Sequence, residues 1–483
     1  MARKKLRVAA AALIHSVIIL TAAQAMGGVE LSQTDANAEV VAALRNRGAE
    51  GLREALAVHD QLSNQLEELS AASMPPRAAQ EEAGSKPAAA GQRRSSEQQI
   101  ESLIARRDQW RAAIDQIGGQ RSCTVSRLYW HTDFEQAKAE ADRTGRPILS
   151  LRMLGKLTDE FSCANSRFFR TSLYSNQEIS EYLRNNYVLH WQSVRPVPRV
   201  TIDFGDGRKL ERTLTGNSAH YVLTAQGQPL DVLPGLYGPK RFLDWLTELR
   251  ALHHEYTVIP ESSRTPILAA FHAIRRDSIV QRWDQDIARL DESLQAAVKS
   301  RLGGIAVVRL ANRRGGPPGA QRAGAVAVGK GAVEMPVLRF ANLGGEQLEK
   351  AMDESLWQAI SNLHRDEVKL DASSVALMRT EFPDAAQAGR VAITKARAED
   401  PLLRVVRQFE ESIGLDTVRN EYLLHRRIHE QFAAGNAVIT NVDQLNEWVY
   451  AELFLTPSSD PWLGLAPSDV YTALEGNGQV VAR

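Results

Sequence analysis

Cysteine is scarce in this chain. Among 483 residues there are two, Cys123 and Cys163. So few cysteines exclude a disulfide framework and a cysteine-rich zinc site, and they allow at most one disulfide, between Cys123 and Cys163. If the two are not bridged, the reactivity of each thiol depends on its local charge and exposure.

Net charge is lacking as well. The chain has 58 Lys and Arg residues against 58 Asp and Glu residues, so its composition predicts no nucleic acid or other strongly charged partner. Signatures of a P-loop, a dinucleotide-binding turn, a Ser/His/Asp nucleophile or a haem are missing, and no cofactor is predicted. The chain does have 43% hydrophobic residues, enough for roughly two to four domains with cores of their own.

The N-terminus carries a basic segment followed by an apolar one. The basic residues are Arg3, Lys4, Lys5 and Arg7. An apolar run from Val8 to Ala23 follows, and Ala-Gln-Ala ends at Ala25. This order is typical of a secretory signal peptide over 1–25 and predicts a periplasmic or secreted protein, which can keep a disulfide. The run is barely long enough to span a bilayer, so membrane attachment is expected only if the segment is not cleaved.

Two stretches beyond this segment have the periodicity of amphipathic helices. Leucines recur every three or four positions over 36–69, and a similar apolar stripe lies over 97–117. The sequence between them, 70–97, is rich in Pro, Gly, Ala and Ser and is predicted to be a flexible linker. Residues 36–118 therefore predict a helical hairpin or coiled-coil arm, which either binds protein partners or packs onto its parent domain.

The middle of the chain, 125–250, alternates predicted helices and strands. Helices are expected at 134–145, 175–186 and 235–256, and strands at 146–154, 187–194, 208–216 and 219–230. Gly205, Asp206 and Gly207 lie in this region and predict a hairpin turn. The alternation indicates an α/β layer structure. Residues 256–483 are predicted to be mainly helical, with a Gly-, Pro- and Ala-rich flexible insert at 312–336.

The predicted C-terminal helices contain one candidate metal-binding pair. His425 and His429 stand four residues apart on one helical face, which is the spacing of metal ligands. Arg426 and Arg427 add positive charge that disfavours a cation. The alternative interpretation is that the two histidines belong to a polar helix face.

The order of elements after Trp130 resembles the thioredoxin-like fold. Trp130 is followed by a helix, by Pro147 at the start of a strand, and later by the strand-like sequence NNYVLHWQSV. Counting back from that strand places Cys163-Ala164-Asn165-Ser166 where the family has its Cys-x-x-Cys motif. The chain thus looks like a degenerate, single-cysteine variant over about 125–250. The resemblance implies a thioredoxin-like central domain with Cys163 as the nucleophile and Ser166 in place of the resolving cysteine.

Two features depart from the family pattern. Seven extra residues, Gly-Lys-Leu-Thr-Asp-Glu-Phe, precede the Ser-Cys163 step. The family's cis-proline, which faces the thiol, corresponds to a position near Ser218, where no proline occurs. A cis bond at a non-proline residue costs about 3–4 kcal/mol, so we expect a trans peptide there.

The chemistry expected at Cys163 depends on what surrounds it. A cysteine at a helix N-terminus is stabilised as a thiolate, and with Ser166 as its neighbour only monothiol exchange remains, unless Cys123 acts as a distant resolving thiol. A cysteine can equally be a small buried residue, and Asp159 and Glu160 would oppose ionisation.

The sequence therefore predicts one of two functions. The first is an exported, non-catalytic or weakly redox-active thioredoxin-like protein that interacts with other envelope proteins. The second is a monothiol thiol–disulfide oxidoreductase, or a factor that retains clients through Cys163.

Overall fold

The computed structural model describes residues 36–73, 87–213, 217–296, 354–381 and 401–463. The chain divides into two compact units, Met1–Tyr129 and Trp130–Arg483. The predicted signal peptide at 1–25 and the predicted insert at 312–336 lie outside the described residues.

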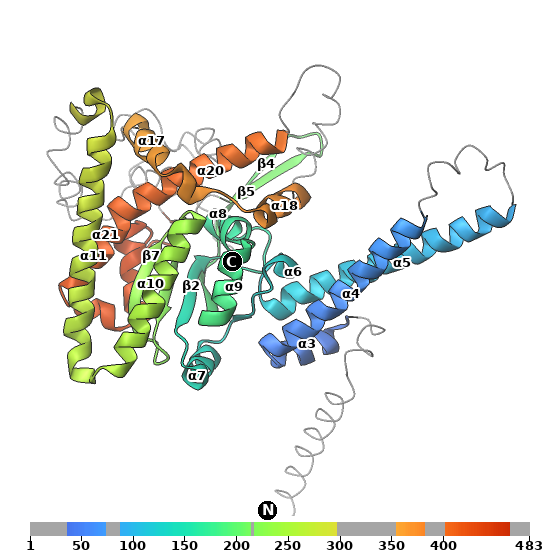
Figure 1. The fold of residues 1–483 in the computed structure, drawn as a ribbon, viewed down its shortest axis with the longest axis horizontal. Helices are drawn as coiled ribbons and strands as arrows, with labels where there is room; N and C mark the ends of the chain where they lie inside the picture. The colour runs from blue at the N-terminus through green and yellow to red at the C-terminus, as the bar shows by residue number, and fades with distance from the viewer. Residues whose placement is uncertain (1–35, 74–86, 214–216, 297–353, 382–400, 464–483) are drawn as a thin grey trace, which may run out of the picture. The chain divides into compact units, whose positions relative to one another are not determined.

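The first unit is helical. Its helices are α3 (Ala38–Asn46), α4 (Ala49–Ser73), α5 (Pro87–Gly118) and α6 (Cys123–Ser126). Helices α4 and α5 pack along each other as a hairpin (Figure 1). Leu52 and Leu62 of α4 are buried in one core with Trp110 and Ile114 of α5. This core exists because the apolar stripes of the two helices face each other.

The helices of this hairpin are longer than the sequence predicts. Helix α4 continues to Ser73 and α5 begins at Pro87, so both ends of the predicted linker at 70–97 are helical. The reason lies in the local sequence. Pro87 suits the first turn of a helix, where its missing N–H has no intrahelical partner, and the alanines after it favour helix more than any other residue.

The second unit is built on a five-stranded mixed sheet. Its strands are β1 (Trp130–His131), β2 (Ile148–Leu154), β3 (Val188–Arg195), β6 (Ser218–Leu223) and β7 (Pro229–Pro234). The order across the sheet is β1-β3-β2-β6-β7. Strands β1, β3 and β2 are parallel, whereas β6 and β7 run antiparallel to their neighbours. Every residue of β2, β6 and β7 is buried, so both faces of the central sheet are covered.

The helices expected around the sheet are present. They are α7 (Phe134–Thr144), α9 (Gln177–Asn186) and α10 (Pro239–Val258). The side chain of Asp133 accepts from the first turn of α7, and that of Asn176 does the same for α9. Gly145 ends α7 with a φ of +64°, a conformation that favours glycine. These signals act between neighbouring residues, so the positions of these helices are predictable from the sequence.

The predicted strands at 208–216 and 219–230 have other bounds in the structure. Residues 219–230 do not form one strand but contribute to β6 and β7, which are joined by a turn at Gly227 with a φ of +85°. Strand β5 (Lys209–Thr213) instead pairs with β4 (Arg199–Asp203) in a separate two-stranded sheet. The glycines at 205 and 207 both have positive φ in the connection, so the predicted hairpin turn is confirmed.

The described part of the C-terminal region is helical, as predicted. Its helices are α11 (Glu261–Arg289), α17 (Glu354–Leu363), η3 (Arg365–Val368), α18 (Ala372–Glu381), α20 (Pro401–Arg419), η4 (Asn420–His425), α21 (Arg426–Ala433), η5 (Ala437–Thr440), α22 (Val442–Trp448) and η6 (Val449–Leu453). Among the described residues, none of the helices is both long enough and apolar enough to cross a bilayer.

These helices belong to the same compact unit as the sheet. Buried hydrogen bonds join the two parts: the Tyr221 hydroxyl donates to Asn446 at 3.0 Å, and the Gly238 amide donates to Thr417 at 2.9 Å. The sequence predicts 125–250 and 256–483 as separate domains. The structure unites them, because apolar and polar groups on both sides are buried only when they pack together.

Candidate functional site

Cys163 lies where the resemblance places it, between strand β2 and a short helix. It is the N-cap residue of α8 (Ala164–Phe168). Its side chain is fully buried. The hydroxyl of Ser166 donates to the Cys163 carbonyl at 2.8 Å and lies 3.4 Å from the Cys163 sulfur. The two predicted site residues are thus brought together, but they are enclosed in the protein.

Ser218 completes the surroundings of the thiol. Its hydroxyl lies 2.9 Å from the Cys163 sulfur. Ser218, near which the resemblance puts the family's cis-proline, thus faces the thiol. The peptide bonds of the described residues are all trans, so the expected trans geometry is confirmed.

A tyrosine from the C-terminal helices holds the loop beside the thiol. Tyr450 is buried in η6, a segment of π-helix, and its hydroxyl donates to the Asn217 carbonyl at 3.0 Å. Burial raises the pKa of Tyr450 well above its usual range, and the nearby Cys163 adds to this effect. Asn217 in turn donates to the Thr456 hydroxyl at 2.9 Å. The loop beside the thiol is therefore held by residues that follow it by more than 200 positions.

The disulfide between Cys123 and Cys163 is not formed. Both residues are free and buried. The Cys123 sulfur donates to the Leu128 carbonyl at 3.4 Å within its own helical unit. Burial, assisted by the charge of Asp115, raises the pKa of the Cys123 thiol far above its ordinary value. Cys123 is thus held as a neutral thiol within its own unit.

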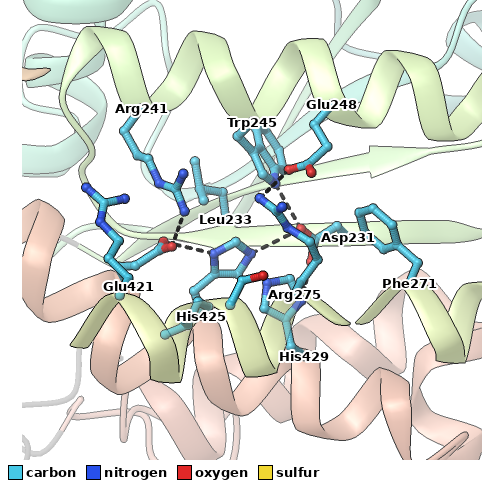
Figure 2. A pocket seen from close by; sticks show the side chains of 13 residues that line it. Asp231, Leu233, Arg241, Trp245, Glu248, Phe271, Arg275, Glu421, His425 and His429 are labelled. Carbon is cyan, nitrogen blue, oxygen red and sulfur yellow. Dashed lines mark hydrogen bonds and ion pairs between the residues drawn. The ribbon is translucent and has the colours of Figure 1, made fainter. Parts of the chain in front are cut away.

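A second cluster surrounds the predicted histidine pair (Figure 2). His425 and His429 are both buried, so the interpretation as a polar helix face is wrong. Nε2 of His425 lies 3.0 Å from Asp231 and its Nδ1 lies 3.2 Å from Glu421. A carboxylate only accepts, so both ring nitrogens are protonated and His425 is a cation. Burial opposes this charge, but Asp231 and Glu421 raise the pKa of His425 to about 9.

Asp231 is the centre of this cluster, and no motif in the sequence pointed to it. It lies in β7 between buried apolar residues. The Trp245 indole donates to its Oδ2 at 2.9 Å. Burial opposes ionisation, but the charge of His425 and its hydrogen bond to the carboxylate hold the pKa of Asp231 well below its usual range. The sequence did contain one signal. Asp231 stands in an otherwise apolar strand, Pro-Leu-Asp-Val-Leu-Pro, and a charge buried in such a strand requires partners.

The cluster borders a cavity of about 220 Å³. Its charged lining is paired: Arg241 with Glu421, and Arg275 with Glu248 at 2.6 Å. Glu421 is buried as well, and although burial opposes its charge, Arg241 and His425 hold its pKa well below normal. The cavity is lined by Asp231, Leu233, Arg241, Trp245, Glu248, Phe271, Arg275, Ser278, Ile279, Arg282, Glu421, His425 and His429.

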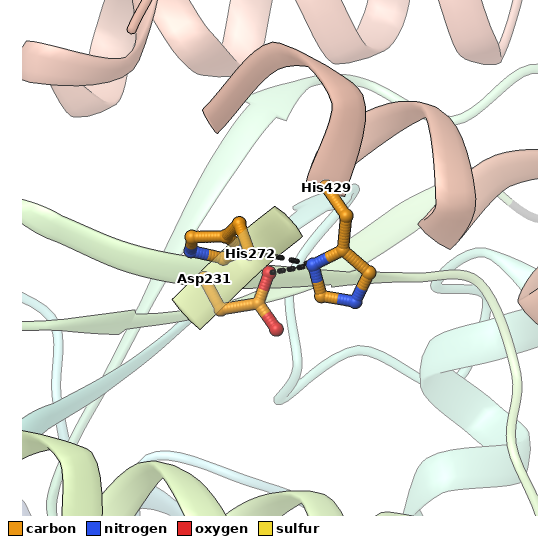
Figure 3. Close-up of side chains that lie close together, drawn as sticks. All are labelled: Asp231, His272 and His429. Atoms are coloured by element: carbon orange, nitrogen blue, oxygen red, sulfur yellow. Dashed lines mark hydrogen bonds and ion pairs between the residues drawn. The ribbon is translucent and has the colours of Figure 1, made fainter. Parts of the chain in front are cut away.

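Three residues of this region could together hold a metal ion. One ligand atom each of Asp231, His272 and His429 lies within 4.8 Å of the other two (Figure 3). His425 is excluded from this set because its nitrogens are occupied by the two carboxylates. The arginines that argued against a cation point elsewhere: Arg426 pairs with Glu430 at 3.0 Å, and Arg427 donates to the Glu452 carbonyl.

Comparisons with protein-family models, with curated proteins and with solved structures find no match to this chain.

Proposed function

We propose that Trp130–Val258 is a thioredoxin-like domain that has lost the ability to catalyse thiol–disulfide exchange. The strand order β1-β3-β2-β6-β7, with the last two strands antiparallel, supports the fold. The position of Cys163 at a helix start after β2, with Ser218 opposite, supports its descent from a redox motif.

The observation that carries the loss of catalysis is the complete burial of Cys163. Exchange requires the sulfur to attack a disulfide of the substrate along an open path. Here the sulfur is enclosed by Ser166 and Ser218, and Tyr450 of the C-terminal helices anchors the adjacent loop. We infer that this part of the domain now serves as a packing surface for its own C-terminal region.

The domain then acts as a scaffold in an exported protein, whose partners are other envelope proteins. The signal-like sequence at 1–25 supports export. The α4–α5 hairpin supports a partner-binding arm, since its two helices already satisfy each other's apolar stripes and leave polar faces outward. Cell fractionation, with the N-terminus read from the mature protein, tests export. Full-length protein that stays in the cytoplasm would contradict it.

Alkylation of a single-thiol variant tests the burial directly. In Cys123→Ser, Cys163 is the remaining thiol. We expect no labelling by a maleimide in the native state at neutral pH and complete labelling in denaturant, because the sulfur has no exposed surface. The matched control, Cys163→Ser, reports on Cys123 in the same way. Rapid native labelling of Cys123→Ser would contradict the proposal.

Such labelling would favour the second function, monothiol exchange or client retention through Cys163. The hydroxyl of Ser218, 2.9 Å from the sulfur, supports it because it is able to donate to a thiolate, whereas the Ser166 proton is donated to the Cys163 carbonyl. It requires the residues around the sulfur to move away in the native protein, so labelling would then be rapid without denaturant.

A further inference from the structure

We propose that Asp231, His272 and His429 form a binding site for one divalent transition-metal ion, with an open coordination position facing the cavity. The three ligands come from β7, α11 and α21, which are distant in sequence and meet only in the folded chain (Figure 3). The proposal is independent of the state of Cys163.

The hydrogen bond of His272 to a carbonyl leaves Nδ1 of its ring able to bind a metal ion. Its Nε2 lies 2.9 Å from the Leu230 carbonyl, which only accepts, so Nε2 carries the proton. In the neutral ring, Nδ1 of His272 therefore keeps its lone pair. A histidine whose second nitrogen is tied to a carbonyl is the usual arrangement at protein metal sites.

The second nitrogen ligand directly faces the first. Nδ1 of His429 lies 2.7 Å from Nδ1 of His272, so His429 donates its proton in this structure. Two nitrogens bound to one tetrahedral ion lie roughly 3.3 Å apart. Binding therefore moves the His429 proton to Nε2 and separates the rings by roughly half an ångström.

Asp231 supplies the observation that points most directly to a ligand. Its Oδ2 accepts from Trp245 and His425. Its Oδ1 is buried and accepts no hydrogen bond from the described residues, and it lies 4.0 Å from Nδ1 of His429. A buried carboxylate oxygen without a partner is costly. An ion between Oδ1 and the two imidazoles satisfies all three atoms at once.

The chemistry of the donors indicates which ion fits. Two imidazoles and one carboxylate suit zinc or ferrous iron, whereas magnesium and calcium prefer oxygen ligands throughout. Asp231 and His429 also line the cavity, so a water or another ligand can complete the coordination from that side. Arg241 and Arg275 face the same cavity, but each is paired with a glutamate.

Titration of zinc into the full chain, prepared without an affinity tag and stripped of bound metal, tests the site. We expect calorimetry to give one zinc ion per chain and no response to magnesium, and cobalt to give the visible absorption of a four- or five-coordinate ion. His429→Gln and Asp231→Asn should abolish this binding. The matched control is His253→Gln, since His253 is also buried but does not line the cavity.

Trp245→Phe is the variant that keeps every ligand. It removes the indole hydrogen bond to Asp231, so we expect about tenfold weaker zinc binding. If the ligand variants fail to fold, this variant and the wild-type spectrum still decide the question. Absence of zinc binding to the wild type overturns the proposal. So does binding that persists unchanged in folded His429→Gln and Asp231→Asn.

Discussion

At the scale of single residues, histidines differ because their surroundings differ. His425 is held as a cation between two carboxylates, whereas burial alone shifts the pKa of His220 in β6. The His220 ring packs between Phe169 and Phe242, with ring centroids 4.5 and 4.9 Å away. Its Nε2 meets the Tyr174 hydroxyl at 2.7 Å, and its Nδ1 has no partner among the described residues. A second proton would therefore be buried without compensation.

This environment predicts a loss of stability in acid. Burial lowers the pKa of His220 to about 3 in the folded state, against about 6.5 in the unfolded chain. Below about pH 6.5 the imidazole takes up a proton in the unfolded state but not in the folded state. The contribution of His220 to the free energy of unfolding is therefore fully present above that pH and falls as the pH approaches 3. We expect His220 to account for about 2 kcal/mol lost between pH 7 and pH 5.

Urea unfolding of His220→Gln at these two pH values measures this contribution. The variant should lose about 2 kcal/mol less than the wild type between them. Tyr174→Phe is the control, because it removes the hydroxyl partner but keeps the buried imidazole. An acid dependence in His220→Gln equal to that of the wild type would show that His220 takes up no proton on unfolding.

At the scale of elements, three segments of π-helix among the described residues lie next to the Cys163 and histidine clusters. They are η2 (Phe169–Leu173), η4 and η6. The first follows the Cys163 helix, the second carries His425, and the third carries Tyr450. A π-segment turns the chain by an extra residue and re-aims the side chains after it, which is why such segments concentrate at functional sites. The sequence gives no sign of them, since apolar spacing is nearly the same in both helix types.

The start of α9 offers a test at this scale. Oδ1 of Asn176 accepts the Ile179 amide at 3.0 Å. Asn176→Ala leaves that amide without its cap and should lower the free energy of unfolding by about 1 kcal/mol, whereas Asn176→Ser should restore most of it. Chemical denaturation followed by circular dichroism measures both.

Asn186→Ala is the matched control for the cap. Asn186 lies at the other end of α9, and its side chain donates to the Tyr182 carbonyl within the helix. We expect a change of less than about 0.5 kcal/mol there. An equal loss in the two alanine variants would contradict a specific capping role for Asn176.

At the scale of the whole second unit, the sheet and the C-terminal helices depend on close contacts between them. Gly235, directly after β7, has a φ of +82°. Asn420 of η4 donates to the Leu236 carbonyl at 2.9 Å. A Cβ at Gly235 would come within 2.5 Å of Nδ2 of Asn420. The two parts therefore meet here with no space for a side chain.

Gly235→Ala should destabilise the unit through both its backbone and this contact. The left-handed conformation costs a residue with a Cβ about 1–2 kcal/mol. Displacing Asn420 and leaving the Leu236 carbonyl unpaired adds about 1–3 kcal/mol. Hydrogen exchange should show faster opening of both β7 and η4 in Gly235→Ala.

Gly145→Ala is the matched control for this contact. Gly145 has a φ of +64°, but a Cβ added there would meet nothing within 4 Å. This variant therefore reports the backbone cost without the clash, and we expect β7 and η4 to keep their protection in it. Protection retained in either β7 or η4 of Gly235→Ala would show that the two parts unfold separately.

Local sequence signals determined most of the elements of this protein. The caps at Asp133 and Asn176, the glycine at 145 and the apolar runs of β2 and β3 act within a few residues, so the helices and strands they define are predictable. The same holds for the spacing of Cys163 and Ser166, which follow one another along a single turn.

Tertiary structure alone decided what these residues do. The sequence located His425 and His429, but their partners lie far away: Asp231 is 194 residues from His425, and His272 is 157 residues from His429. The loop beside Cys163 is likewise held by a hydrogen bond between Tyr450 and Asn217, which are 233 residues apart. The physical reason is that burial, pairing and pKa depend on all groups within a few ångströms. Local periodicity and turn chemistry describe only neighbours along the chain.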